Sequence, residues 1–171
     1  NVKLLLSASQ SHPRAQLTAL PRENPDAPPM FCMLLRKHLT GGRLLAITQP
    51  PMERMVELKF EAANELGDRV ERRLVLEAIS RRANLLLLDG EGRIIDCIRR
   101  VDSGLDSGTG QSRILQPGMF YRLPPAVEKA DPAALSPDEL EALFSAAPPD
   151  SRGSGWLLDT FGGLSPLICR E

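Results

Sequence analysis

Residues 28–60 constrain the fold of this chain more than any other stretch. They read PPMFCMLLRKHLTGGRLLAITQPPMERMVELKF, which predicts a helix, a glycine stop, a strand, a proline-bearing turn and a second strand. Proline suits the first helical turn, where its missing N–H is not needed. Glycine accepts the left-handed conformation found at many helix ends. We therefore expect a helix over Met30–Leu39, and its almost wholly apolar first half predicts that it is largely buried.

Two strands are expected to follow this helix, over Arg43–Thr48 and Met55–Phe60. Apolar and charged side chains alternate along the second strand, which is typical of an antiparallel strand with one buried face. Residues 70–79 fit a helix or a strand, because their leucines and valines do not settle the period. Further strands are expected over residues 2–8, 14–19, 84–89 and 93–101.

The C-terminal part of the sequence predicts helices. Ser136 has the position of an N-cap, with Glu139 three residues later as in a capping box. Residues 149–155 are expected to form a loop, and Ser165 is expected to cap a second helix start after a Gly-Gly turn.

The composition is that of a globular protein with a mixed fold. Of the 171 residues, 42% are hydrophobic and 25% are charged, and the formal net charge is −1. We expect an α+β fold with an antiparallel β-sandwich-like core and one buried helix over residues 1–125. A linker and the start of a helical domain are expected over residues 126–171. No apolar run approaches the roughly 20 residues that span a bilayer, so no membrane association is expected.

Three cysteines at distant positions indicate free thiols. Cys32, Cys97 and Cys169 have neither the even number of a disulfide framework nor the paired spacing of a metal site. With only two histidines in the chain, a zinc site is not expected. The sequence therefore predicts a protein of a reducing compartment, the cytoplasm, with no metal and no cofactor.

Basic residues gather at the end of the predicted helix. The residues Arg36, Lys37 and His38 fall in its last turn, where cations complement the helix dipole. A second interpretation adds Arg43 and Arg54 and makes a small basic face for phosphates. Residues 31–60 hold five Lys/Arg and two Asp/Glu.

Elsewhere the charges are mixed. Residues 61–100 carry eight Lys/Arg against eight Asp/Glu. The arginines at 72, 73, 81 and 82 are plausible phosphate contacts, but a solvated face of mixed charge is the better interpretation for most of them. Residues 121–171 hold four Lys/Arg and eight Asp/Glu, so the C-terminal part is expected to link domains rather than bind nucleic acid.

Several segments, spread over nearly the whole chain, carry a family resemblance. They are LLLSAS near the start, PMFCMLLRKHL-x-GGR, NELGDR, RRANLLLLD, LPPAVEKADP and FGGLSPLICRE at the end. Together they resemble the N-terminal domain of the NFACT family, that of bacterial RqcH, also known as fibronectin-binding protein A-like, and of eukaryotic NEMF. The resemblance implies a fold like the N-terminal domain of formamidopyrimidine-DNA glycosylases, followed by a helix-hairpin-helix region.

The resemblance also implies a function. NFACT proteins are non-enzymatic factors of ribosome-associated quality control, which bind a large (50S) ribosomal subunit obstructed by a peptidyl-tRNA nascent chain. They bring in charged tRNA, alanine tRNA in bacteria, so that the stalled peptide gains a C-terminal tail. An Asp-Arg pair of the family recruits the tRNA, and this chain has Glu53 and Arg54 there. Supporting tRNA contacts are then expected from Arg36, Lys37, His38 and Arg43.

Two other functions are kept as alternatives. The glycosylase-like fold suggests an enzyme that processes DNA lesions, although a fold does not by itself carry a function. The older family name suggests a fibronectin-binding adhesin at the cell surface. Glu53 and Arg54 could also be an ordinary exposed salt bridge with no role in binding. Such pairs are common and contribute about 0–1 kcal/mol to stability.

Overall fold

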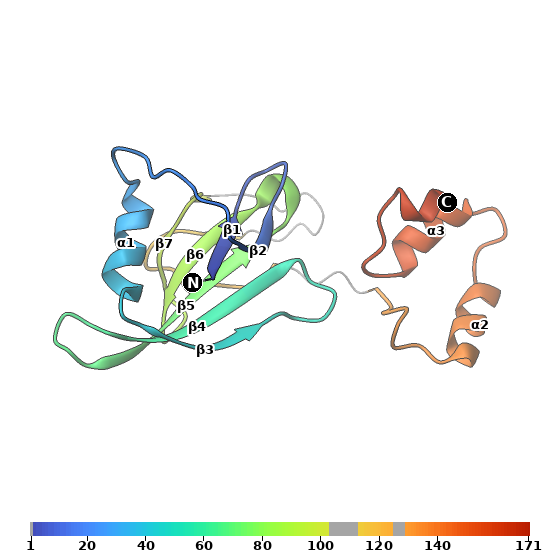
Figure 1. The fold of residues 1–171 in the computed structure, drawn as a ribbon. Helices are drawn as coiled ribbons and strands as arrows, with labels where there is room; N and C mark the ends of the chain where they lie inside the picture. The colour runs from blue at the N-terminus through green and yellow to red at the C-terminus, as the bar shows by residue number, and fades with distance from the viewer. Residues whose placement is uncertain (1, 103–112, 125–128) are drawn as a thin grey trace. The chain divides into compact units, whose positions relative to one another are not determined.

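The computed structural model describes residues 2–102, 113–124 and 129–171 (Figure 1). The chain divides into two compact units. The first comprises Asn1–Pro50 and Arg54–Pro124, and the second comprises Pro51–Glu53 and Pro125–Glu171. The first unit holds the sheets and one helix, whereas the second is mainly helical. The predicted domain boundary between residues 125 and 126 lies outside the described residues.

A five-stranded antiparallel sheet forms the centre of the first unit. Each strand pairs with the next one along the chain, so the sheet is a simple meander. In register, Leu58 lies opposite Leu74, which in turn lies opposite Leu87. The strands are β3 (Arg43–Thr48), β4 (Met55–Ala63), β5 (Arg69–Glu77), β6 (Asn84–Asp89) and β7 (Ile94–Cys97). The predictions of β3 and β6 are thereby confirmed.

The ambiguous segment at residues 70–79 is a strand, β5. Its second half, Leu74–Glu77, is buried at every position, because both faces of the sheet are covered there. A strand buried on both faces loses the alternation of apolar and polar side chains. That loss explains why the sequence alone could not distinguish a strand from a helix.

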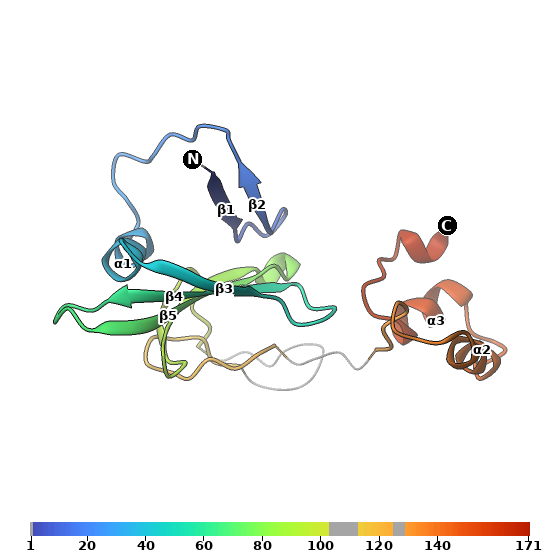
Figure 2. The same ribbon diagram turned by 60° about the horizontal axis from the view of Figure 1, so that its bottom comes forward.

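One face of the sheet is covered by a hairpin and a helix (Figure 2). The hairpin is β1 (Lys3–Ser7) with β2 (Arg14–Thr18), and the helix is α1 (Met30–Leu39), with the predicted bounds. The core on this face consists of buried Ala8, Leu58, Leu74, Leu76 and Leu85, with Phe31, Leu35 and Leu39 of α1 packed against them.

Helix α1 is less buried than predicted. None of its residues is buried, and the side chain of Met30 is 72% exposed. The helix contacts the sheet through one stripe, Phe31, Leu35 and Leu39, at a spacing of four residues. The remaining apolar residues of the helix therefore lie outside this contact. The composition of the helix does not show how many of its residues contact the sheet.

A second core lies on the other face, over one end of the sheet. Met55, Val75, Leu86, Leu88, Ile94, Cys97 and Leu115 form it, with Tyr121 packed against them. The chain after β7 supplies its cover, through bridges from Val101 to Leu115 and from Arg93 to Phe120.

The second unit contains two helices and an aromatic cluster. Helix α2 (Pro137–Ser145) begins with the predicted capping box, in which the Ser136 hydroxyl accepts a hydrogen bond from the N–H of Glu139. The rings of Phe144, Trp156 and Phe161 pack together, with centroids 4.9–6.3 Å apart. Aromatic pairs at this separation stabilise beyond the area that they bury.

The prediction of a loop over residues 149–155 was partly wrong. Helix α3 (Gly153–Thr160) begins inside it, although two of its first three residues are glycines, which disfavour helices. The helix is held by packing of Trp156 against its neighbours rather than by propensity. After the Gly-Gly turn, the Ser165 hydroxyl accepts a hydrogen bond from Ile168 N–H at the start of a short 3₁₀ helix.

In the described ranges, no helix is long and apolar enough to cross a membrane. The same ranges hold no group of three or more His, Cys, Asp and Glu side chains in a metal-binding arrangement. The three cysteines are free thiols. The likeness to glycosylase N-terminal domains and the helix-hairpin-helix stay predictions.

Candidate nucleic-acid interface

Arg54 immediately precedes β4, and the sheet fixes its backbone. Its carbonyl oxygen accepts a hydrogen bond of 2.7 Å from Ala78 N–H, just beyond the end of β5. The next residue, Met55, is buried in the core and pairs with Glu77. The side chain of Arg54 is exposed, and within the described ranges its guanidinium has no ion-pair or hydrogen-bond partner. The result is a free cation on a rigid support.

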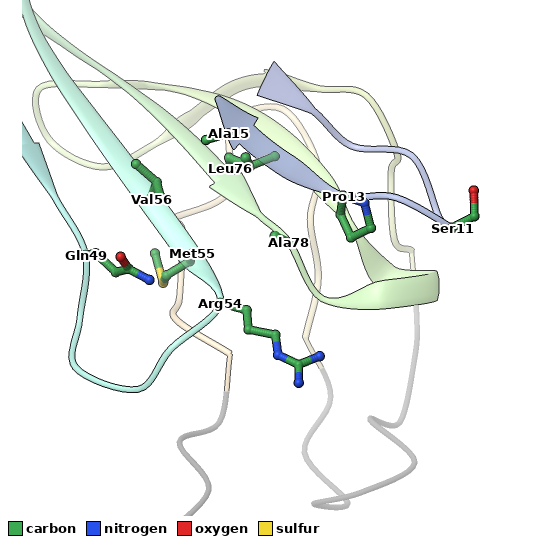
Figure 3. A pocket seen from close by; sticks show the side chains of 9 residues that line it. All are labelled: Ser11, Pro13, Ala15, Gln49, Arg54, Met55, Val56, Leu76 and Ala78. Carbon is green, nitrogen blue, oxygen red and sulfur yellow. The ribbon is translucent and has the colours of Figure 1, made fainter. Parts of the chain in front are cut away.

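A pocket of about 550 Å³ opens beside Arg54 (Figure 3). The hairpin β1–β2 and the ends of β4 and β5 form its walls. Its apolar lining is Pro13, Ala15, Met55, Val56, Leu76 and Ala78, and its polar lining is Ser11, Gln49 and Arg54. An apolar wall can accept the flat face of a base, and a guanidinium can pair with a phosphate or a base edge. This arrangement suits one nucleotide of a single-stranded segment.

Glu53 is positioned differently from Arg54. It belongs to the turn Pro51–Glu53, which groups with the second unit. Within that unit Met52 has a φ of 59°, which is rare for a residue with a side chain. The methyl group of Met52 lies against the Gly-Gly turn, where a Cβ added to Gly163 would be only 2.5 Å away. Glycine is favoured at position 163 by its φ of 74°, whereas the flexible end of Met52 could move away from an added Cβ.

A buried charge, Glu77, lies opposite Met55, the residue after Arg54. Glu77 is 1% exposed and forms a bidentate ion pair with Arg113, in which the Nη1–Oε2 distance is 2.9 Å. The Tyr121 hydroxyl donates to Glu77 Oε1 at 2.8 Å. Burial and the charge of Glu77 raise the pKa of Tyr121, so its hydroxyl stays protonated. This cluster ties the end of β5 to the segment that closes the second core.

The structure does not bring the predicted basic residues together. Arg43 is the Cα partner of Glu61, which is seven residues beyond Arg54 along β4, or roughly 20 Å at the rise of a strand. Arg43 forms an ion pair of 3.3 Å with Glu61, which a second cation, Arg69, also contacts. Arg36, Lys37 and His38 lie in the last turn of α1.

The far half of β4 and β5 carries neutralised charges on the face away from α1. Lys59 pairs with Glu71 at 2.7 Å, and Arg73 lies 3.9 Å from Glu57. Side chains at alternate positions share a face, so the odd-numbered residues of both strands form this ladder. Arg73 and Glu57 are each only 25% exposed, so the solvated face of mixed charge stays a prediction.

Two features of the site were missed in the sequence. Glu77 is the single charged residue in the run Leu74–Ile79, and an acid inside an apolar strand was a signal for a buried ion pair. The pocket beside Arg54 had no local signal, because its walls come from a hairpin and strands that lie far apart in the sequence.

The chain matches the family model described as NFACT N-terminal and middle domains over residues 1–171. A relative from Bacillus subtilis (strain 168), named Rqc2 homolog RqcH, is 39% identical over 172 residues, which cover all of this chain and 29% of that protein.

Two solved structures are also similar. The N-terminal domain of fibronectin-binding protein PavA from Streptococcus pneumoniae has a TM-score of 0.79 and 31% identity, covering 98% of this chain and 64% of that one. The N-terminal part of the fibronectin/fibrinogen-binding protein from Streptococcus suis has a TM-score of 0.81 and 30% identity, covering 99% and 61%.

The family model spans the whole chain, and the identity to the relative from Bacillus subtilis is well above the level at which only a fold is shared. The chain spans less than a third of that relative's length. It therefore belongs to the NFACT family and corresponds to the N-terminal part of its longer members.

Proposed function

We propose that this chain is the tRNA-binding part of a cytoplasmic factor of ribosome-associated quality control. The whole protein would bind a large (50S) ribosomal subunit obstructed by peptidyl-tRNA and bring in tRNA, alanine tRNA in bacteria. The nascent chain would then gain its C-terminal tail in the ribosome's own centre, so this chain would need no cofactor and perform no catalysis. Family membership supports the general role.

The observation that carries the proposal is the exposed guanidinium of Arg54 at the edge of the pocket, which has no partner among the described residues. The sheet fixes its backbone, so binding at the guanidinium does not have to order the main chain. Many cations of the same sheet already have a carboxylate partner, for example Arg43 and Arg69 on Glu61. Arg54 can therefore neutralise a phosphate without first breaking an ion pair, which releases a counterion condensed on the RNA.

Glu53 is proposed as a tRNA contact from the family pair alone. The family has Asp at this position, and Glu keeps the charge but adds one methylene. The neighbouring Met52, held against Gly163, limits how far this turn can adjust. We propose that the longer side chain reaches the exocyclic amine of a base, which is a contact that carboxylates make in nucleic-acid recognition.

The adhesin interpretation has one specific observation in its favour. Both similar solved structures are named as binding proteins for fibronectin, or for fibronectin and fibrinogen. A binding assay on immobilised fibronectin, with the native protein and an Arg54→Ala variant, separates the two functions. The tRNA proposal predicts no binding to fibronectin that depends on Arg54. The DNA-lesion enzyme rests only on the expected likeness to glycosylases, and no observation in the described residues favours it.

The experiment that tests the proposal is to purify the full-length protein from its host and to sequence the RNA that copurifies. Three forms are compared: the native protein, Arg54→Ala, and the control Arg69→Ala, which removes a paired cation on the opposite face. We expect alanine tRNA and large-subunit RNA with the native and control forms, and selective loss of tRNA from Arg54→Ala. Absence of both RNAs from every form would refute the quality-control role.

A further inference from the structure

A second cationic hollow lies at the opposite end of β4 from Arg54. It has a volume of about 360 Å³ and is lined by Lys37, His38, Ala63, Asn64, Glu65, Leu66 and Arg72. Helix α1 and the β4–β5 turn, which lie toward the same end of the sheet in both views (Figure 1, Figure 2), bring these residues together. Three of the seven side chains are basic, and one is acidic.

The fold puts Arg72 on the face of the sheet that packs against α1. Arg72 is the Cα partner of Phe60, which packs with the core beneath α1. Arg54 lies in the bend before β4, six residues from Phe60, so the two Cα atoms are about 20 Å apart along the strand. The hollow and the pocket beside Arg54 therefore lie at opposite ends of β4, with the core beneath α1 and the hairpin between them.

The hollow has an excess of positive charge. Lys37 forms an ion pair of 2.5 Å with Glu65, but both side chains are more than half exposed, so this pair is weak. Arg72 donates from Nη1 to the Glu71 carbonyl, whereas its Nε is buried and has no partner among the described residues. A buried donor without an acceptor is costly and calls for a missing anion or water.

Among the described residues, no carboxylate forms an ion pair with Arg72. Asp89 lies opposite it on β6, but its Oδ1 accepts hydrogen bonds from the N–H groups of Glu91 and Arg93 in the adjacent turn. Burial, and after it the charges of Arg72 and Lys37, lower the pKa of His38.

We propose that this hollow binds a backbone phosphate of RNA, with Arg72 and Lys37 as its contacts. The ligand is a polymer, because an exposed cation, Arg54, lies about 20 Å away at the other end of β4, within the reach of one RNA. The identity of the polymer as RNA rests on the proposed function, whereas the anion site itself rests on the geometry of the hollow. Such a contact positions a nucleic acid without reading its sequence.

The test measures binding of the chain to a fluorescein-labelled 20-base-pair RNA duplex and to alanine tRNA over a series of salt concentrations. Arg72→Gln should weaken binding to both about tenfold. It should also reduce the slope of log K against log salt by about 0.7–0.9, the value for one phosphate contact. Arg72→Lys should retain most of the binding, because it keeps the charge. Arg69→Gln, at the same end but on the opposite face, should change neither quantity.

A gain of affinity excludes simple damage to the fold. Glu65→Gln removes the one carboxylate among the lining residues and frees Lys37, so it should tighten binding to both RNAs. If Arg72→Gln and Glu65→Gln leave RNA binding unchanged while Arg54→Ala weakens it, this inference fails and the proposed function stands. If only the hollow variants alter binding, the phosphate site stands and the role of Arg54 fails. If inorganic phosphate binds the hollow but leaves the affinity for both RNAs unchanged, the inference is also overturned.

Discussion

At the scale of single residues, the cations of the sheet differ in whether a carboxylate already neutralises them. Arg43 and Arg69 share Glu61, and Lys59 has Glu71. A cation of this kind must break an ion pair before it meets a phosphate, so its net contribution to binding is small. Arg54 and Arg72 have no such partner within the described ranges. Pairing, rather than position in the sequence, therefore separates binding candidates from the solvated surface.

His38 predicts a loss of stability in mild acid. Its pKa is lowered below the ordinary 6.5 by burial and by the charges of Arg72 and Lys37. The unfolded chain therefore takes up this proton first, and the free energy of unfolding falls as the pH drops below about 6.5. Melting temperatures at pH 7.5 and pH 5.5 should show a smaller acid-induced decrease for His38→Gln than for the native chain. Equal decreases would contradict this account of the hollow's charge.

Glu77→Gln should lower the free energy of unfolding by about 3 kcal/mol, because it leaves Arg113 partly buried without its counter-ion. Denaturant unfolding measures this change. The matched control is Glu57→Gln, whose carboxylate lies 3.9 Å from Arg73 at a more exposed position and should cost less than about 1 kcal/mol. Similar losses in the two variants would show that the Glu77 cluster does not stabilise the support of Arg54.

At the scale of elements, local signals predicted the bounds of α1, β3 and β6 correctly. Proline, glycine and a leucine run mark these elements within a few residues. The sequence did not settle β5, which is buried on both faces, and it missed the start of α3, where packing outweighs two glycines. It also overestimated the burial of α1, since apolar content does not show how much of a helix a sheet can cover.

The capping box of α2 gives an element-scale prediction. The Ser136 hydroxyl accepts from Glu139 N–H, and the Glu139 carboxylate accepts from Ser136 N–H at 2.8 Å. Ser136→Ala should destabilise the helix by about 1 kcal/mol. Amide hydrogen exchange should then accelerate over residues 137–140, whereas Ser145→Ala at the other end of α2 should leave it unchanged. Unchanged exchange in Ser136→Ala would show that the cap does not hold the helix.

At the scale of the whole molecule, the sequence located one residue of the site and missed its surroundings. Arg54 was predicted through the family resemblance, whereas its pocket depends on the position of the β1–β2 hairpin over the sheet. The supporting set of Arg36, Lys37, His38 and Arg43 was predicted from closeness along the chain. These four residues lie toward the other end of β4 from Arg54. Each strand residue adds about 3.3 Å, so the length of β4 keeps them away from it.

Two proposed anion contacts, at opposite ends of β4, also predict the salt dependence of the whole chain. Each phosphate contact contributes about 0.7–0.9 to the slope of log K against log salt, so Arg54→Ala combined with Arg72→Gln should reduce the slope by about 1.4–1.8. Positions about 20 Å apart with no shared partner are expected to act independently. The slopes come from RNA titrations at four or more salt concentrations. If the slope for the double variant equals the slope for one of the single variants, the two contacts are not separate.

The central claim, that Arg54 grips tRNA, is tested most directly by the dissociation constant of alanine tRNA measured on three forms of the chain. These are the native chain, Arg54→Ala and Arg54→Lys, with Arg69→Ala as the control for loss of one charge. We predict weaker binding by about tenfold for Arg54→Ala, partial recovery in Arg54→Lys, and the native value for the control. Equal dissociation constants for the native chain and Arg54→Ala would contradict the claim.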